Sequence, residues 1–507
     1  MKTNRIYKIL AVLALPMLLL TVSCEDVLEK EPITSIAVEN TYKTEADMIS
    51  AVNSVYDVLQ WQSLNGSHCF PLIFQGIRSD DLHSQQANFW ALGADFDNFS
   101  TILPHNASVL QVWNKWYQGV SRANTALHIY ETFEFTTPGL RERLEGEAKF
   151  LRALCYFELV RLFGGVPLLT EAITSTDQEL FLPRASTSAI YDQILQDCSQ
   201  ASSLLPKMGS EEQGRATAGA ALALEAKANL YNGNWSEVVR LCEEIMGHGY
   251  DLETNFADNF ELDNEFGIES IFEINYVDGL VAGGFETGGV NQQEGSGAWQ
   301  MMFMWLSGKY TSWGNFIPRQ SLIAIYDEAD TRLDATFIVP GTVLNSPGLA
   351  AVGWDPAPDF TLAVGSSAYC RKYFLDWEEV DALLSVQQSP KNEKIIRYAD
   401  VLLMHAEASA MGGGGNGQAS LDAIRERAGL GSIPLTLENV KSERRKELAT
   451  EGWNRFTDLV RWGDAASNPV LIEKGFKAGR DELLPIPQTE INIVGSDLLP
   501  QNPGYNQ

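Results

Sequence analysis

A run of regularly spaced alanines at 215–232 constrains the fold of this sequence more than any other segment. Its seven alanines are Ala216, Ala218, Ala220, Ala221, Ala223, Ala226 and Ala228. Alanine favours helix, and its small side chain lets a neighbouring helix approach closely. Gly233 and Asn234 then break the pattern, and a second helix is predicted up to Met246. The segment therefore predicts two helices packed closely across a short turn.

Apolar residues at helical spacing recur along much of the chain and predict further helices. The segments are about 44–61, 108–133, 139–163, 187–205, 397–411, 418–428, 437–451 and 454–463. Thr44 and Asp47 are placed to cap the first, and Pro138 and Gly139 predict a tight break between two antiparallel helices. Such pairs, with Tyr231 near one turn, resemble tetratricopeptide repeats, which stack into a solenoid.

The segments between the helix pairs have a different composition. Residues 64–107 are aromatic and rich in turn formers, and residues 278–316 contain nine glycines beside several aromatic residues. Irregular segments of this length are uncommon in a compact domain unless they serve a function. Short strands are expected at 268–276 and 369–377.

The N-terminus predicts export and lipid attachment. Lys2, Arg5 and Lys8 precede an apolar run at 9–20, which is too short to span a bilayer but suits a signal peptide. Small residues then lead into Cys24, as in a lipobox, so we expect cleavage after residue 23 and acylation of Cys24. The acidic residues that follow resemble a surface-export signal. Residues 24–40 are therefore interpreted as a tether on the outer membrane, facing the cell exterior.

The charge of the chain disfavours nucleic acid as a partner. The formal net charge is −29, and removal of residues 1–23, which hold three basic residues and no acidic one, takes it to −32. A body this acidic repels phosphate backbones, whereas a neutral or cationic ligand fits better. The other cysteines are expected to be buried free thiols, because they are widely spaced and odd in number: Cys69, Cys155, Cys198, Cys242 and Cys370.

Motifs for catalysis are missing from the sequence. It contains no P-loop, no G-x-S-x-G and no H-E-x-x-H, and its six histidines are scattered. The adjacent acids Asp80 and Asp81 do not by themselves indicate a glycosidase, which needs carboxyls on opposite sides of a bond. We therefore predict no catalytic residue, no cofactor and no metal site. Acid-rich stretches at 95–97 and 258–265 leave a weak possibility of structural calcium.

Two aromatic clusters are candidates for sugar binding. Sugars have apolar C–H faces that stack on aromatic rings and hydroxyls that bond to polar side chains. The first cluster contains Trp299, Trp305, Tyr310 and Trp313, and the second contains Trp90 near Arg78, Asp80 and Asp81. The alternative for each tryptophan is packing within its own loop.

Several motifs in order along the chain together resemble the SusD/RagB family of cell-surface glycan-binding lipoproteins. They include Arg184-Ala185-Ser186-Thr187, Gly214-Arg215-Ala216-Thr217, the segment 396–408, Arg425-x-Arg427-Ala428-Gly429-Leu430, Arg455-Phe456-x-Asp458-Leu459 and Asn502-Pro503-Gly504-Tyr505. Departures are Ala423, where the family often has Asn, and an inserted Trp453-Asn454.

The resemblance implies a mainly α fold over 41–507. Tetratricopeptide-like helix pairs would form a right-handed superhelical scaffold at about 41–63, 108–250 and 395–465. A long, loop-rich ligand-binding half with a few short strands would comprise about 64–107 and 251–394. The hallmark arginines 397, 425, 444, 445 and 461 are expected to form ion pairs with acids on adjacent helices, rather than to bind ligand.

The function implied is capture of an oligosaccharide or polysaccharide and its delivery to a SusC-like TonB-dependent transporter in the outer membrane. Two alternatives stay open. The first alternative is a tetratricopeptide-type scaffold that binds only proteins, and the second, less favoured, is a glycoside hydrolase.

Overall fold

The computed structural model describes the chain in eight segments. These are residues 42–60, 72–84, 95–173, 181–208, 212–277, 314–375, 379 and 389–506. The chain divides into two compact units, Met1–Asp47 and Met48–Gln507, and the first helix, α3 (Glu45–Tyr56), begins in one and continues in the other. In the first unit the Asp47 carboxylate accepts hydrogen bonds from the backbone N–H groups of Lys43 and Thr44, which confirms the predicted cap.

The predicted helices are present with small differences at their ends. They are α5 (Ala107–Thr132), α6 (Leu140–Phe163), α7 (Thr187–Leu204), α8 (Ala218–Tyr231), α9 (Trp235–Met246), α15 (Tyr398–Ala410), α16 (Gly417–Arg427), α17 (Leu437–Glu447) and α18 (Arg455–Arg461). Local chemistry sets the boundaries: the Ser186 hydroxyl caps α7 at the N–H of Ala189, and Gly139, with φ of 76°, precedes α6.

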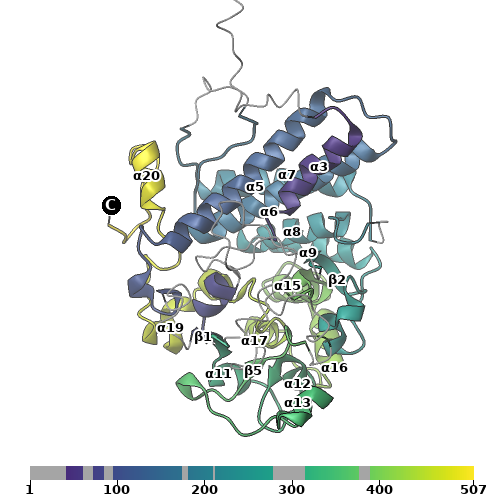
Figure 1. The fold of residues 1–507 in the computed structure, drawn as a ribbon, viewed down its shortest axis with the longest axis vertical. Helices are drawn as coiled ribbons and strands as arrows, with labels where there is room; N and C mark the ends of the chain where they lie inside the picture. The colour runs from purple at the N-terminus through teal and green to yellow at the C-terminus, as the bar shows by residue number, and fades with distance from the viewer. Residues whose placement is uncertain are drawn as a thin grey trace, which may run out of the picture. The chain divides into compact units, whose positions relative to one another are not determined.

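Consecutive helices in the second unit pack against one another in order. Contacts join α5 to α6, α6 to α7, α7 to α8 and α8 to α9, and α15 lies against both α9 and α16 (Figure 1). The alanines of α8 are buried, as expected for a helix enclosed by neighbours. At the α5–α6 crossing the approach requires glycine, because a Cβ at Gly119 would lie 2.5 Å from Sγ of Cys155.

Shorter elements complete the described part of the chain. They are η3 (Leu72–Ile77), η4 (Phe99–Thr101), η5 (Phe256–Phe260), η6 (Leu262–Asn264), α11 (Gln320–Ile323), α12 (Arg332–Thr336), α13 (Pro347–Ala351), η7 (Ala363–Gly365), η8 (Ala465–Ser467), α19 (Pro469–Glu473) and α20 (Gln488–Val494).

The strands form short antiparallel pairs. β1 (Leu82–Ser84) pairs with β3 (Phe316–Pro318), β2 (Ser270–Ile274) with β6 (Glu393–Arg397), and β4 (Phe337–Ile338) with β5 (Tyr369–Cys370). The strand predicted at 268–276 is thus confirmed in its central residues. The strand predicted at 369–377 is confirmed only at its start, because a turn follows at Lys372 and Tyr373, in which the N–H of Phe374 donates to the carbonyl of Arg371 at 2.8 Å.

Buried ion pairs join the C-terminal helices to the strands. Arg397, at the end of β6, bonds to Glu451 at 2.7 Å and to Glu447 at 3.1 Å, while Arg425 meets Glu443 at 2.8 Å. The other predicted arginines are also paired: Arg444 with Asp400 and Asp458, Arg461 with Glu407 and Asp458, and Arg445 with Asp80 and Asp81. The predicted ion pairing of these arginines is confirmed, but the partners of Arg445 lie in the segment between η3 and β1 and not on a helix.

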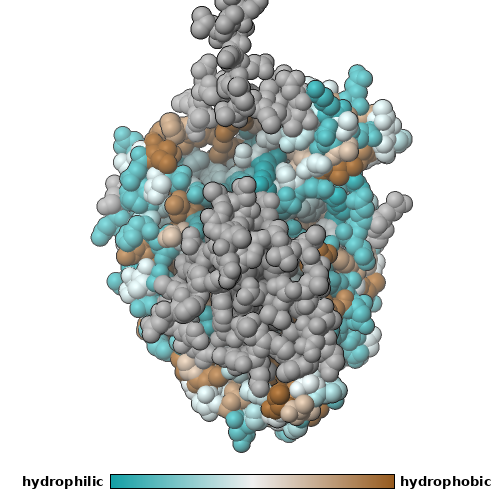
Figure 2. Space-filling model, viewed as in Figure 1, coloured by the Kyte–Doolittle hydropathy of each residue, from teal (hydrophilic) through white to brown (hydrophobic). Residues whose placement is uncertain are grey.

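The cysteines of the described segments are buried and unpaired, as predicted: Cys155, Cys198, Cys242 and Cys370. Burial raises the pKa of each of these thiols, so they remain protonated at neutral pH. Cys24 and Cys69 lie outside the described residues. Across the described segments, no helix combines the length and the apolar character needed to cross a membrane. On the face drawn in Figure 2, apolar residues form separate patches among hydrophilic ones.

Candidate functional site

Three of the predicted glycan contacts lie in the short segment between η3 and β1, and all three are buried. Arg78 is 1% exposed, and its guanidinium carbon lies 4.0 Å from the ring centroid of Phe456. Its Nη2 donates to the carbonyl of Asp481 at 2.9 Å, and burial lowers the pKa of Arg78 to about 10. The side chain therefore packs between the η3 segment and the C-terminal part of the chain.

Asp80 and Asp81 form an ion-paired cluster with arginines of α17 and α18. Arg455 donates to both oxygens of Asp80, at 2.7 and 2.8 Å, and Nε of Arg445 lies 2.8 Å from Asp81. Burial alone would raise the pKa of Asp80, but the charges of Arg455 and Arg445 outweigh it and hold that pKa well below its usual range. Burial raises the pKa of Asp81.

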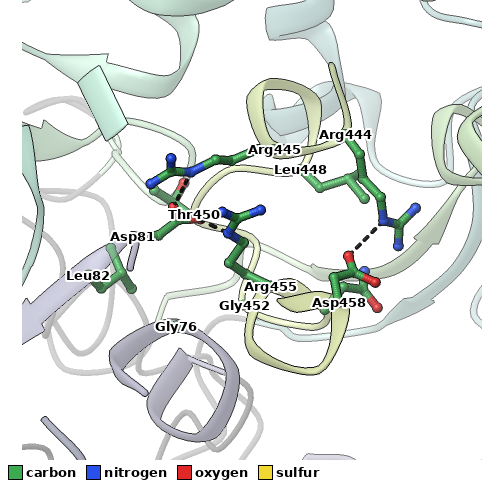
Figure 3. Close-up of a pocket in the computed structure, with 11 residues that line it drawn as sticks. Gly76, Asp81, Leu82, Arg444, Arg445, Leu448, Thr450, Gly452, Arg455 and Asp458 are labelled. Carbon is green, nitrogen blue, oxygen red and sulfur yellow. Dashed lines mark hydrogen bonds and ion pairs between the residues drawn. The ribbon is translucent and has the colours of Figure 1, made fainter. Parts of the chain in front are cut away.

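The cluster leaves little room for a ligand. In Figure 3, Arg445 and Arg455 reach toward Asp81, and Arg444 is bonded to Asp458 beside them. The cavity between these residues measures about 20 Å³, which is the space of about one water molecule. The cluster therefore joins the segment that carries Asp80 to α17 and α18, and glycan contact by Asp80 or Asp81 stays a prediction.

Lys474 fixes the same segment from its other side. Its Nζ donates to the carbonyls of Ile77, Ser79 and Leu82 at 2.5, 2.6 and 3.1 Å, and lies 2.7 Å from Oδ1 of Asp97. Burial lowers the pKa of Lys474. One buried ammonium thus satisfies three backbone acceptors of the turn that leads into β1.

Asp97 links this lysine to β1. Its Oδ2 lies 2.5 Å from Nδ1 of His83 and accepts a hydrogen bond from the N–H of Ser84. Burial would raise the pKa of Asp97, but His83 and Lys474 together lower it. The carboxylate oxygens of Asp97, which the sequence offered for calcium, are therefore engaged by protein donors, as is Asp95, which accepts from Asn106. Among the described residues, no group of three or more His, Cys, Asp and Glu is arranged to hold a metal ion.

The β1–β3 ladder joins two short described strands that lie near the predicted aromatic contacts in sequence. Trp90, Trp299, Trp305, Tyr310 and Trp313 lie outside the described residues. Ser84, the last residue of β1, pairs with Phe316, the first residue of β3. Because the strands are antiparallel, the chain toward Trp90 and the chain toward Trp313 leave the ladder at the same end.

Sequence reasoning missed the residues that hold this ladder. Lys474 is 377 residues from Asp97, and Arg455 is 375 residues from Asp80. Asp97 drew attention only as a possible calcium ligand, and Lys474 is a single lysine with no motif around it. The acidic pair at 80–81 and the arginine-rich segment at 444–455 were both visible, but nothing local in the sequence joins them.

Two family models match this chain in adjacent parts. A model described as "Starch-binding associating with outer membrane" matches residues 26–230, and a model described as "SusD family" matches residues 268–505.

The similar proteins cover nearly the whole chain. A SusD-like protein of Formosa agariphila is 27% identical over 93% of this chain and 94% of its own length. The structure of a laminarin-binding SusD-like protein is 32% identical, covers 92% of this chain and 100% of that one, and superimposes with a TM-score of 0.77. Surface glycan-binding protein A from Bacteroides thetaiotaomicron, in complex with laminarihexaose, is 25% identical over 90% of this chain and 99% of that one, with a TM-score of 0.75.

Proposed function

The chain belongs to the SusD family, and on that basis we propose that it is a non-catalytic glycan-binding lipoprotein of the outer membrane. In this proposal the protein, anchored through Cys24 and facing the cell exterior, captures an oligosaccharide or polysaccharide. It then passes the glycan to a SusC-like TonB-dependent transporter.

The observation that carries the proposal is the β1–β3 ladder. It pairs Ser84 with Phe316, and the five predicted aromatic contacts follow Ser84 or precede Phe316 in the sequence. Trp90 is six residues from Ser84, and Trp313 is three residues from Phe316. Aromatic faces gathered from both segments would stack on successive sugar rings, while polar neighbours bond the hydroxyls.

A rigid base supports this arrangement. Asp80 and Asp81 are tied to α17 and α18, and Lys474 holds the turn before β1. A site whose base is fixed loses less conformational entropy when the ligand binds than a site on free loops. In this proposal the buried ion pairs contribute to binding by holding the base of the site in place.

Laminarin is the first glycan to test. Two similar structures belong to proteins named for binding laminarin or solved with laminarihexaose. We propose a glucan of this kind as the ligand, and affinity electrophoresis in gels containing laminarin, starch or other polysaccharides measures it directly. The soluble form that begins at Glu25 should be retarded by at least one of them.

The aromatic contacts are tested by single substitutions in the same gels. Trp299→Ala and Trp313→Ala should each lower the apparent affinity, measured from gel retardation, about tenfold or more. Neither should lower the melting temperature, because a ring that contacts the sugar contributes to ligand binding and not to the core. Phe181→Ala, which removes an aromatic ring that is 47% exposed, is the control and should leave retardation unchanged. Unchanged retardation in both tryptophan variants would contradict the proposal that these residues contact the glycan.

The tests of the lipid anchor and of the transporter partner use the full-length chain in its native membrane. Cys24→Ala should move the protein from the membrane fraction to the soluble fraction, because acyl chains at that residue would supply the anchor. The wild-type chain should co-purify with a TonB-dependent transporter from detergent-solubilised outer membranes. Recovery of the Cys24→Ala variant in the membrane fraction would contradict the lipid anchor.

The same preparation separates this proposal from its alternatives. A scaffold that binds only proteins would show no retardation by any polysaccharide. A glycoside hydrolase would release reducing ends from a retained polysaccharide, which a reducing-sugar assay detects. The proposal expects retardation and no release.

A further inference from the structure

A second cavity, of about 280 Å³, lies between η5, α12 and the residues that follow β5. Its volume is near the lower end, about 300 Å³, of sites that hold small molecules. None of the described residues that line it belongs to the eight predicted glycan contacts. It is more than ten times as large as the space within the Asp81–Arg455 cluster.

The floor of this cavity is apolar and rigidly supported. Phe260, Leu344 and Phe374 line it, and each is less than 10% exposed. Leu344 and Phe374 also belong to the buried cluster that contains Ile317 of β3. The apolar floor is therefore part of the same core that supports the β1–β3 ladder.

Polar groups with unused hydrogen-bonding capacity surround the apolar floor. Within the described segments, no residue forms a hydrogen bond with the side chain of Glu261, Thr331 or Asp334. Arg371 uses Nη1 to donate to the carbonyl of Asp334 at 2.9 Å, and the other N–H groups of its guanidinium have no acceptor among those residues. This differs from the Asp80–Arg455 cluster, where the charged groups satisfy one another.

The combination of groups selects one ligand class. The carboxylates of Glu261 and Asp334 accept hydrogen bonds, Arg371 donates them, and Thr331 does both, which matches the hydroxyls of a sugar. Lys391 is buried and donates to the carbonyl of Phe374 at 2.7 Å. The described lining contains three acids, Glu261, Asp334 and Glu379, against two basic residues, so its net charge is negative and disfavours a phosphate or a carboxylate ligand.

We propose that this cavity is a second saccharide site, which binds one neutral sugar ring or the end of a chain. The inference takes its ligand class from the proposed function, but the described residues of the site are separate in sequence from the predicted aromatic contacts. A second site of this size would hold a glycan more weakly than the main site and raise the avidity of the protein for a polymer.

The experiment uses the soluble chain from Glu25 with Trp299→Ala and Trp313→Ala, so that the main site is weakened. The probes are glucose, galactose, mannose and N-acetylglucosamine, observed by saturation-transfer NMR. At least one should bind. Ala335→Trp, which fills the cavity, should abolish that signal, whereas Ala350→Trp, at an exposed position on α13, should keep it.

Asp334→Asn tests the site without changing its volume. It should weaken binding about tenfold, because it removes a charged acceptor. Binding of no probe, or binding that survives both Ala335→Trp and Asp334→Asn, would overturn the second site. If the wild-type chain is still retarded by laminarin in that case, the proposed function stands. If the monosaccharide signal depends on Ala335 but no polysaccharide is retained, the second site stands and the proposed function fails.

Discussion

Replacement of Lys474 by methionine tests whether one buried cation holds the base of the proposed site. Lys474 is 5% exposed, and its Nζ serves three carbonyls and the Asp97 carboxylate. Methionine preserves most of the volume but leaves these acceptors without a donor. Removal of one partner from a buried ion pair costs about 3–5 kcal/mol.

The expected shift in melting temperature follows from the size of the chain. Unfolding entropy is about 2.1 cal/mol/K per residue, so for this chain it is about 1 kcal/mol/K, and Lys474→Met should lower the midpoint by about 3–5 °C. Differential scanning calorimetry of the soluble form measures the shift. Retardation by polysaccharide should weaken as well, because the turn that leads toward Trp90 loses its support.

Lys149→Met is the matched control. Lys149 pairs with Glu145 at 2.5 Å one turn away along α6, and both side chains keep contact with solvent. A pair of this kind within one helix contributes less than about 1 kcal/mol. The midpoint of thermal unfolding of the Lys149→Met variant should stay within about 1 °C of that of the wild type. Equal midpoints for Lys474→Met and Lys149→Met would refute the reasoning.

Two further changes test the helical scaffold. Burial, with the nearby charges of Glu237 and Glu244, raises the pKa of Glu225 to about 7, above its unfolded value of about 4.3, so its ionisation destabilises the fold as pH rises between these values. Glu225→Gln should therefore add about 1 kcal/mol of stability at pH 8, allowing for solvent screening, and nothing at pH 4 in urea titrations; an equal gain at both would contradict it. Gly119→Ala should cost about 1–3 kcal/mol through its collision with Sγ of Cys155. Adding Cys155→Ala should recover most of that loss in urea midpoints, and no recovery would place the strain elsewhere.

The scaffold was predictable because its signals are local. The apolar period of 139–163, the break at Pro138 and Gly139 and the capping serine at 186 each act within a few residues of the helix they define. The predicted limits of α6 and α7 differ from the structure by one residue at most. For Arg397 the sequence predicted an ion pair with an acid on a neighbouring helix, but not which acid, because many acids were available there.

The base of the site was not predictable in the same way. Asp80 and Asp81 were chosen because they stand near Trp90 in sequence, but their partners in the structure are Arg445 and Arg455, more than 360 residues away. The second cavity combines Phe260, Asp334 and Arg371 from three separate segments. Contacts of this kind depend on the completed packing of distant segments, which no local spacing records.

The β1–β3 ladder has a consequence for variation of the protein. Only three residue pairs join its strands, from Leu82 with Pro318 to Ser84 with Phe316. We expect that residues inserted or deleted after Ser84 or before Phe316 change neither the register of the two strands nor the helices of the scaffold. We therefore propose that the corresponding segments of a relative can be exchanged at this junction, and that such an exchange changes ligand preference while the described body keeps its fold.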